Sequence, residues 1–157
     1  DTSLMAELAN ITEALKMLEG FSPIQRVLLT CTGTLQGTLS AYFGEAVEVQ
    51  VLNQISLSLG RYSRKVRLFT PSNNISVCRA YTSIITTSPE VIDLIEGEKL
   101  GIGQVLEHLG LKPKFKLKKV GQGKNSFGRD YELASSVDGM PIVNYQINEI
   151  FPKELYK

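Results

Sequence analysis

The chain is short of the residue types that build the commonest chemical sites. Its 157 residues include two cysteines, Cys31 and Cys78, one histidine, His108, and no tryptophan. Two cysteines cannot make a framework of disulfides, and three soft ligands scattered along the chain do not form a metal-binding motif. The sequence therefore predicts no bound metal and no structural disulfide, and reduced thiols are typical of a cytoplasmic protein.

Long apolar runs and an excess of one charge are also missing. No segment approaches the roughly 18 uninterrupted apolar residues that span a membrane, and the N-terminal residues lack the pattern of a signal peptide. With 17 basic and 16 acidic residues the net charge is +1, so bulk electrostatics attract neither nucleic acid nor a membrane surface. The length suits one domain, residues 1–157, with a single core.

The spacing of apolar residues predicts the secondary structure. Helical spacing predicts a first helix over 4–18 and two short helices, 22–28 and 35–43, joined by a turn. A second helix-turn-helix unit is predicted over 88–109. Alternation at period two predicts strands at 46–51, 62–68, 75–85, 112–118, 127–137 and 141–152. The predicted fold is α+β: an antiparallel sheet of about six strands, with helices on one side and two helix-turn-helix flaps.

A stripe of lysines marks one of these strands. Lys112, Lys114, Lys116 and Lys118 occupy every second position of the segment. This pattern is typical of the solvated face of an edge strand, where lysines discourage pairing with other chains. A stripe that follows nucleic-acid phosphates is the alternative. Nearby carboxylates balance the charge, which favours the edge strand and predicts no nucleic-acid partner.

Two charged residues interrupt otherwise apolar strand faces. Glu149 shares a face with Val143, Tyr145, Ile147 and Phe151, and Arg64 shares one with Tyr62, Val66 and Leu68. Lys65 and Arg67 point the other way. A carboxylate on an apolar face loses hydration, which raises its pKa unless a cation or several donors compensate. Glu149 is therefore half of a buried ion pair, a poised acid or base, or a side chain that reaches water where Pro152 ends the strand.

Arg64 and Glu149 allow two arrangements. If they face each other they form a buried salt bridge, which says little about stability. If they lie apart with a cavity between them, they offer a cation for an anionic ligand and an acid or base at the far end. The residues alone leave both arrangements open. In the second, the two helical pairs would cover a small anionic ligand.

Four short motifs follow one another in a characteristic order. They are Thr32-Gly-Thr-Leu-Gln36 in the first helical pair, Arg64-Lys-Val66 on a strand, Gly101-Ile-Gly103 in the second helical pair, and Asn148-Glu-Ile-Phe-Pro152 on the last strand. Over roughly residues 24–152 this order resembles the chorismate lyase family, especially its divergent branch of small bacterial and archaeal proteins. Enzymes of that family split chorismate into 4-hydroxybenzoate and pyruvate without metal or organic cofactor. They bury the product under two helix-turn-helix flaps.

The resemblance implies roles for four residues. Arg64 would bind the ring carboxylate, and Glu149 would lie near the ring oxygen. Leu35 and Ile102 would close the pocket from the two flaps, at positions where the family often has methionine and leucine. Placing the arginine at Arg64 needs a one-residue difference in the following turn, so Arg67 is a weaker candidate, and the apolar face favours Arg64. The implied partners are small aromatic or cyclohexadienyl carboxylates such as chorismate and 4-hydroxybenzoate.

A non-catalytic binding domain for a small aromatic carboxylic acid is the alternative function. The same fold occurs in effector-sensing domains of bacterial transcription regulators. Those normally carry an N-terminal winged helix, for which this chain is too short, and the presence of both Arg64 and Glu149 favours the lyase. Around Thr32 and Gly37 the chain lacks the acidic and basic residues common in the family. A substrate other than chorismate is therefore a further alternative.

Overall fold

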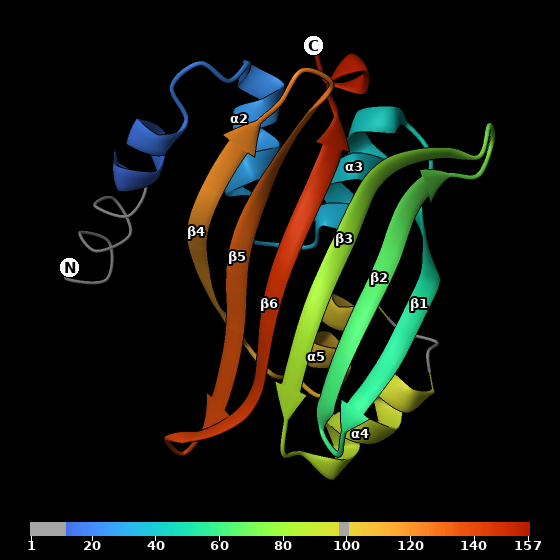
Figure 1. Cartoon of the computed structure of the whole chain (residues 1–157), viewed down its shortest axis with the longest axis vertical. Helices are drawn as coiled ribbons and strands as arrows, with labels where there is room; N and C mark the ends of the chain where they lie inside the picture. Colours follow the sequence, from blue (N-terminus) through green and yellow to red (C-terminus); the bar gives the residue numbers. More distant parts are fainter. Residues whose placement is uncertain (1–11, 98–100) are drawn as a thin grey trace.

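The computed structural model describes residues 12–97 and 101–157. A six-stranded antiparallel sheet in the order β1-β2-β3-β6-β5-β4 is its centre (Figure 1). The strands are β1 Glu48–Ser58, β2 Arg61–Thr70, β3 Ile75–Thr86, β4 Lys114–Gln122, β5 Ser126–Val137 and β6 Met140–Pro152. The helices are α2 Pro23–Thr30, α3 Leu35–Phe43, α4 Pro89–Glu96, α5 Ile102–His108 and the short 3-10 helix η1 Lys153–Leu155. The predicted α+β class is confirmed.

Several helix ends coincide with the capping residues that the sequence predicts. Ser22 caps α2 and forms a capping box with Gln25, and Ser88 caps α4 through the amide of Val91. Gly44 ends α3 in the left-handed conformation, at φ 72°. Of the predicted first helix, residues 12–17 are helical, and the part before residue 12 lies outside the described residues.

The helices cover one face of the sheet and form two pairs at its opposite ends (Figure 1). Each pair packs on its own group of buried side chains. The upper cluster, under α2 and α3, comprises Leu18, Phe21, Leu28, Leu29, Leu35, Leu39, Val47, Leu68, Val77, Cys78, Phe127, Phe151 and Tyr156. The lower cluster, under α4 and α5, comprises Tyr62, Ile84, Val91, Ile95, Val105, Leu106, Tyr131, Leu133, Val143, Tyr145 and Ile147. Of the predicted site residues, Arg64 and Glu149 lie on the sheet, in β2 and β6, and Leu35 and Ile102 begin α3 and α5.

The lysine-rich strand β4 is at an edge of the sheet. Its lysines at 114, 116, 118 and 119 are exposed, while Phe115 and Leu117 are half-buried. Lys118 pairs with Glu132 of β5 at 3.3 Å. The edge-strand interpretation of the lysine stripe is confirmed.

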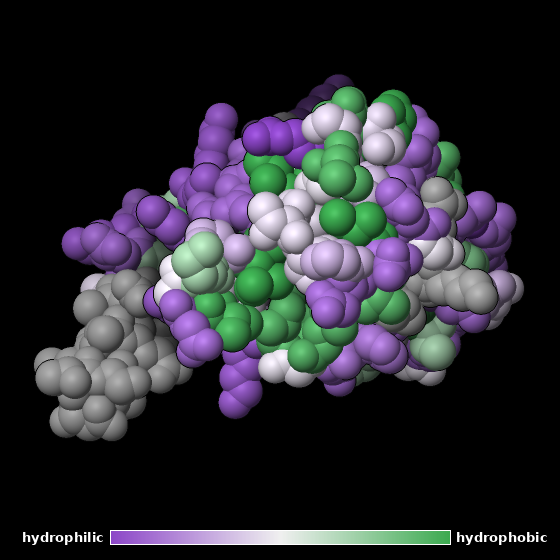
Figure 2. Space-filling model, turned by 90° about the horizontal axis from the view of Figure 1, so that it is seen from below, coloured by the Kyte–Doolittle hydropathy of each residue, from purple (hydrophilic) through white to green (hydrophobic). Residues whose placement is uncertain are grey.

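Apolar side chains are also exposed at the lower end of the molecule. Seen from below, hydrophobic residues gather there among polar ones (Figure 2). Leu57, Leu59, Val137 and Met140, at or beside the ends of two hairpins, are among the exposed large hydrophobic residues. No helix within residues 12–97 and 101–157 is both long enough and apolar enough to cross a membrane.

Candidate functional site

Strand register brings Arg64 and Glu149 onto the same face of the sheet. Arg64 on β2 is opposite Thr82 on β3, and Thr82 is opposite Ile147 on β6. Glu149 follows two residues later on β6 and therefore points the same way. With strands about 4.8 Å apart and a rise of about 3.3 Å per residue, the Cα atoms of Arg64 and Glu149 lie about 12 Å apart. The two side chains therefore share the covered face but do not lie directly opposite each other.

Arg64 is buried, as its place on an apolar face predicts. It is 3% exposed and lies between Gln54 of β1 and Thr82 of β3. Burial raises the pKa of the Tyr145 hydroxyl, and the positive charge of Arg64 partly offsets that shift. The charge of Arg64 on β2 therefore influences the acidity of the buried Tyr145 hydroxyl on β6.

Glu149 is buried as well and does not reach water at the end of its strand. It is 4% exposed, and both of its oxygens accept hydrogen bonds from β5. Arg129 Nε donates to Oε1 at 2.7 Å, and the hydroxyl of Tyr131 donates to Oε2 at 2.8 Å. Glu149 is therefore half of a buried ion pair, and its partner is Arg129 rather than Arg64. The cation and the second donor compensate the lost hydration.

Arg129 connects this carboxylate to the first helical pair. Its Nη1 donates to the backbone carbonyls of Leu29 at 3.1 Å and Cys31 at 2.7 Å, the last turn and C-cap of α2. Its guanidinium also lies over the ring of Tyr131, 4.3 Å from the centroid. Burial alone would lower the pKa of Arg129, but the charge of Glu149 and its hydrogen bond raise it above the usual value. Arg129 is thus a buried cation with anionic or carbonyl partners on two elements.

Two neutral groups beside the ion pair have strongly perturbed acidity. Burial, together with the charge of Glu149, raises the pKa of the Tyr131 hydroxyl well above its usual value. The same two causes raise the pKa of the Cys78 thiol. Both groups therefore stay protonated, and Tyr131 remains a hydrogen-bond donor to Glu149.

The two predicted flap residues lie at opposite ends of the covered face. Leu35 begins α3, is 8% exposed and belongs to the upper cluster. Ile102 begins α5 and packs, half-buried, against the lower cluster. The Ile102 carbonyl accepts a long hydrogen bond, 3.4 Å, from the hydroxyl of Tyr145. The structure places these two residues on the two helical pairs but in separate clusters.

Arg67, the weaker candidate for the anchoring cation, serves another purpose. Its side chain donates to Gln50 of β1, to Ser76 of β3 and to Asn74 in the β2–β3 turn. It also stacks on Phe69 at 4.3 Å. These contacts fix the end of the hairpin on the face away from Glu149.

Sequence reasoning did not identify Arg129 and Tyr131 as site residues. The signal was present, since Phe127, Arg129, Tyr131 and Leu133 alternate along β5 with an arginine on the apolar face. This is the same signal that identified Arg64. That Arg129, and not Arg64, is the partner of Glu149 follows only from the register, in which Arg129 is directly opposite Glu149.

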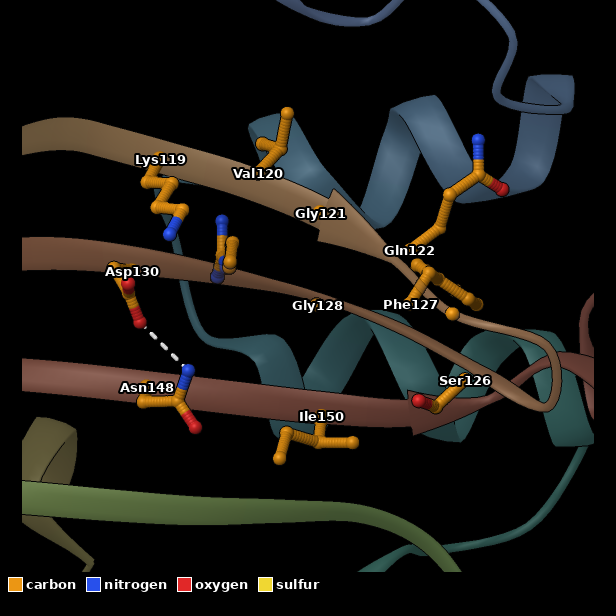
Figure 3. A pocket seen from close by; sticks show the side chains of 12 residues that line it. Lys119, Val120, Gly121, Gln122, Ser126, Phe127, Gly128, Asp130, Asn148 and Ile150 are labelled. Atoms are coloured by element: carbon orange, nitrogen blue, oxygen red, sulfur yellow. Dashed lines mark hydrogen bonds between the residues drawn. The ribbon is translucent and has the colours of Figure 1, made fainter.

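Two hollows lie on the surface of the protein. One of about 230 Å³ lies on the uncovered face, where Gly121 and Gly128 leave the sheet without side chains (Figure 3). Lys119, Asp130 and Asn148 surround it, and Asn148 donates to Asp130 at 2.6 Å. Another is lined by residues near the C-terminal end, among them Lys124, Lys153 and Tyr156. Arg129 lines the first hollow, whereas Arg64 and Glu149 line neither. Both of those side chains are almost completely buried.

Within the described part of the chain, no group of three or more His, Cys, Asp or Glu side chains could hold a metal ion. The chain matches no protein-family model. A search of curated proteins found no match either.

Proposed function

We propose that the protein is a cofactor-independent carbon–oxygen lyase that splits chorismate into 4-hydroxybenzoate and pyruvate beneath two helical flaps. One observation carries the proposal: a buried cation, Arg64, and a buried carboxylate, Glu149, lie on the same face of the sheet. Two helical pairs cover that face at its opposite ends (Figure 1). The order of the four sequence motifs supports the same function.

The reaction needs one proton transfer and one bond cleavage on the ring. A base removes the proton from ring carbon 4, and that electron pair forms the new ring double bond. The bond between ring carbon 3 and the ether oxygen breaks, and enolpyruvate leaves with the bonding pair. The released proton returns to the methylene carbon of enolpyruvate, which becomes pyruvate. The ring becomes aromatic, which drives the reaction forward.

Arg64 and Glu149 take separate roles in this reaction. Arg64 anchors the ring carboxylate, since a guanidinium binds a carboxylate through two parallel hydrogen bonds. Glu149 accepts the proton from ring carbon 4. Its two oxygens already accept from Arg129 and Tyr131, contacts that suit an ionised carboxylate, and an ionised carboxylate acts as a base rather than an acid.

Access to this site requires movement of a helical pair. Arg64 and Glu149 are only 3% and 4% exposed, so a substrate reaches them when α2–α3 or α4–α5 lifts from the sheet. Closure then excludes water from the reacting ring, and reopening releases the product.

The alternative is a non-catalytic binding domain for a small aromatic carboxylic acid. The Arg129–Glu149 ion pair favours it, because a carboxylate held by two internal donors is suited to fixing structure. In that case Arg64 binds the ligand and Glu149 performs no proton transfer.

Incubation with chorismate, followed by chromatographic measurement of both products, tests the proposal. Wild type should release equal amounts of 4-hydroxybenzoate and pyruvate above the spontaneous rate. Arg64→Ala and Glu149→Gln should each lower kcat/KM by about 10²-fold or more. Arg67→Ala is the matched control, because that arginine lies on the same strand and faces away from Glu149.

Two outcomes contradict the lyase. Wild-type turnover in both Arg64→Ala and Glu149→Gln would exclude the assigned roles. Absence of turnover, combined with a rise in melting temperature on adding 4-hydroxybenzoate, would establish the binding domain instead.

A further inference from the structure

Arg129 bridges the buried carboxylate and the first helical pair. One edge of its guanidinium donates to Glu149 on β6, and the neighbouring nitrogen donates to the carbonyls of Leu29 and Cys31 at the end of α2. A planar guanidinium presents these donors in fixed relative directions. The position of the Glu149 carboxylate and the position of the α2 terminus are therefore set by the same rigid group.

The C-terminal end of α2 carries no basic side chain of its own. The last carbonyls of a helix nevertheless lack partners within the helix and carry partial negative charge. Arg129 supplies that positive charge from the sheet, across 98 residues of sequence to Cys31. The connection to α3 starts directly after these hydrogen-bonded carbonyls, and α3 begins at Leu35.

We propose that Arg129 is a positioning residue that couples the Glu149 carboxylate to the α2–α3 flap. With Glu149 charged and bonded to Arg129, the guanidinium is held where it fastens the C-terminal end of α2. Loss of the carboxylate charge releases the guanidinium, and the α2–α3 connection opens more often. The catalytic consequence of this coupling rests on the proposed lyase function, but the coupling itself does not.

Tyr131 provides the contrast that distinguishes coupling from general loosening. It donates to the other oxygen of Glu149 and makes no hydrogen bond to α2. Tyr131→Phe therefore removes a bond to the carboxylate while Arg129 keeps its bonds to Glu149, Leu29 and Cys31. Arg129→Lys keeps the bond from Tyr131 to Glu149 but breaks the link to α2, because a single ammonium cannot bind both the carboxylate and the helix end.

Amide hydrogen exchange of the full chain, followed by NMR, tests the coupling without any ligand. The reporters are the amides of Cys31 and Thr38. Cys31 donates to the Leu28 carbonyl at the end of α2, and Thr38 donates to the Thr34 carbonyl at the start of α3. The amides of Ile92 and Val105, in α4 and α5, are the internal reference. Arg129→Lys and Glu149→Gln should each speed exchange at the reporters about tenfold relative to the reference, and Tyr131→Phe should not.

The exchange measurement can overturn the proposal in two ways. If Glu149→Gln leaves the reporters unchanged while Arg129→Lys speeds them, Arg129 caps α2 without coupling it to the carboxylate. If every variant speeds the reporters and the reference equally, the network only stabilises the fold.

Turnover of chorismate then tests the catalytic consequence. If Arg129 acts through Glu149, the double variant Arg129→Lys/Glu149→Gln turns over no more slowly than Glu149→Gln alone, because residues acting as a unit are not additive. A double variant slower by the product of the two single effects would overturn the assignment as a positioning residue. If wild type has no turnover, the proposed lyase fails, and the exchange result still decides the coupling.

Discussion

Glu149 and Arg129 form an ion pair from which water is almost entirely excluded, since their side chains are 5% and 1% exposed. Removing one member of such a pair leaves the other as a buried charge without its counter-ion. Replacing both members avoids that penalty. The pair therefore matters to stability mainly through the consequence of breaking it.

Arg129→Met and Glu149→Leu should each lower the free energy of unfolding by about 3–5 kcal/mol. In the double variant the free energy of unfolding should fall by about 1–3 kcal/mol less than the sum of the two single losses, because no unpaired charge stays buried. Urea unfolding monitored by circular dichroism measures all three. Arg67→Met, which removes a hydrogen-bonded surface arginine, serves as the control. Strictly additive losses would contradict the ion-pair account.

Alternation along a strand predicted part of this network and could have predicted more. It identified Arg64 and Glu149 because each is a charge on an apolar face, and both are buried. It also applies to Arg129, which occupies the same kind of position on β5. What alternation cannot supply is the pairing, since the partner of Glu149 depends on which residue the register places opposite it.

At the scale of elements, the backbones of β5 and β6 leave no room for a side chain at Gly128, beside the ion pair. A Cβ at Gly128 would lie 2.3 Å from the backbone oxygen of Glu149, whereas a Cβ at Gly121, the cross-strand partner of Gly128 on β4, meets nothing within 4 Å. The absence of a side chain at Gly128 therefore permits the strand spacing that brings Arg129 to Glu149.

Gly128→Ala should lower the free energy of unfolding by about 1–3 kcal/mol, because the strands must separate to admit the methyl group. Gly121→Ala should change it by less than about 0.5 kcal/mol. Urea unfolding of the two variants provides a matched comparison on neighbouring strands. Equal effects would show that strand separation is not the cause.

The lysines of edge strand β4 are expected to keep the protein from associating through that edge. Replacing Lys114, Lys116 and Lys119 together by threonine should increase self-association with little change in stability, since charged side chains on an edge oppose pairing with another chain. Light scattering at rising protein concentration measures it. The control replaces Lys124 and Lys153, which lie outside β4. Equal scattering of both variants would contradict the protective role.

Strand lengths were less predictable than strand existence. The alternation that predicts a strand at 46–51 stops where a register shift occurs between Val51 and Asn53, yet β1 continues to Ser58. A bulge inserts one residue and exchanges the two faces, so a period-two pattern ends although the strand does not. The predicted strand at 112–118 likewise extends to Gln122 past a shift between Leu117 and Lys119.

At the scale of the whole molecule, the site depends on a feature that local patterns do not contain. The order of helical and strand segments predicts the α+β class, but the last strand, β6, lies between β3 and β5 in the middle of the sheet. That placement puts Glu149 opposite Arg129 on one side and Ala80 on the other. Long-range pairing of this kind is decided by the whole core rather than by any one segment.

Buried tyrosines in both clusters make the stability of the entire fold sensitive to alkaline pH. Burial, the hydrogen bond to Glu96 and the charges of Glu96 and Asp93 raise the pKa of Tyr62 to about 12. Burial is also the leading cause that raises the pKa of Tyr131, Tyr145 and Tyr156 above the usual value. Tyr156 belongs to the upper cluster and the other three to the lower one.

The stability of the fold should therefore fall steeply above about pH 10. In the unfolded chain these phenols ionise near pH 10, so above that pH the unfolded state binds fewer protons than the folded state and is favoured. For Tyr62 the loss continues until its folded pKa of about 12. The urea midpoint at pH 8, 10.5 and 11.5 measures the decline, and Tyr62→Phe should make it shallower. A midpoint unchanged between pH 8 and 11.5 would contradict it.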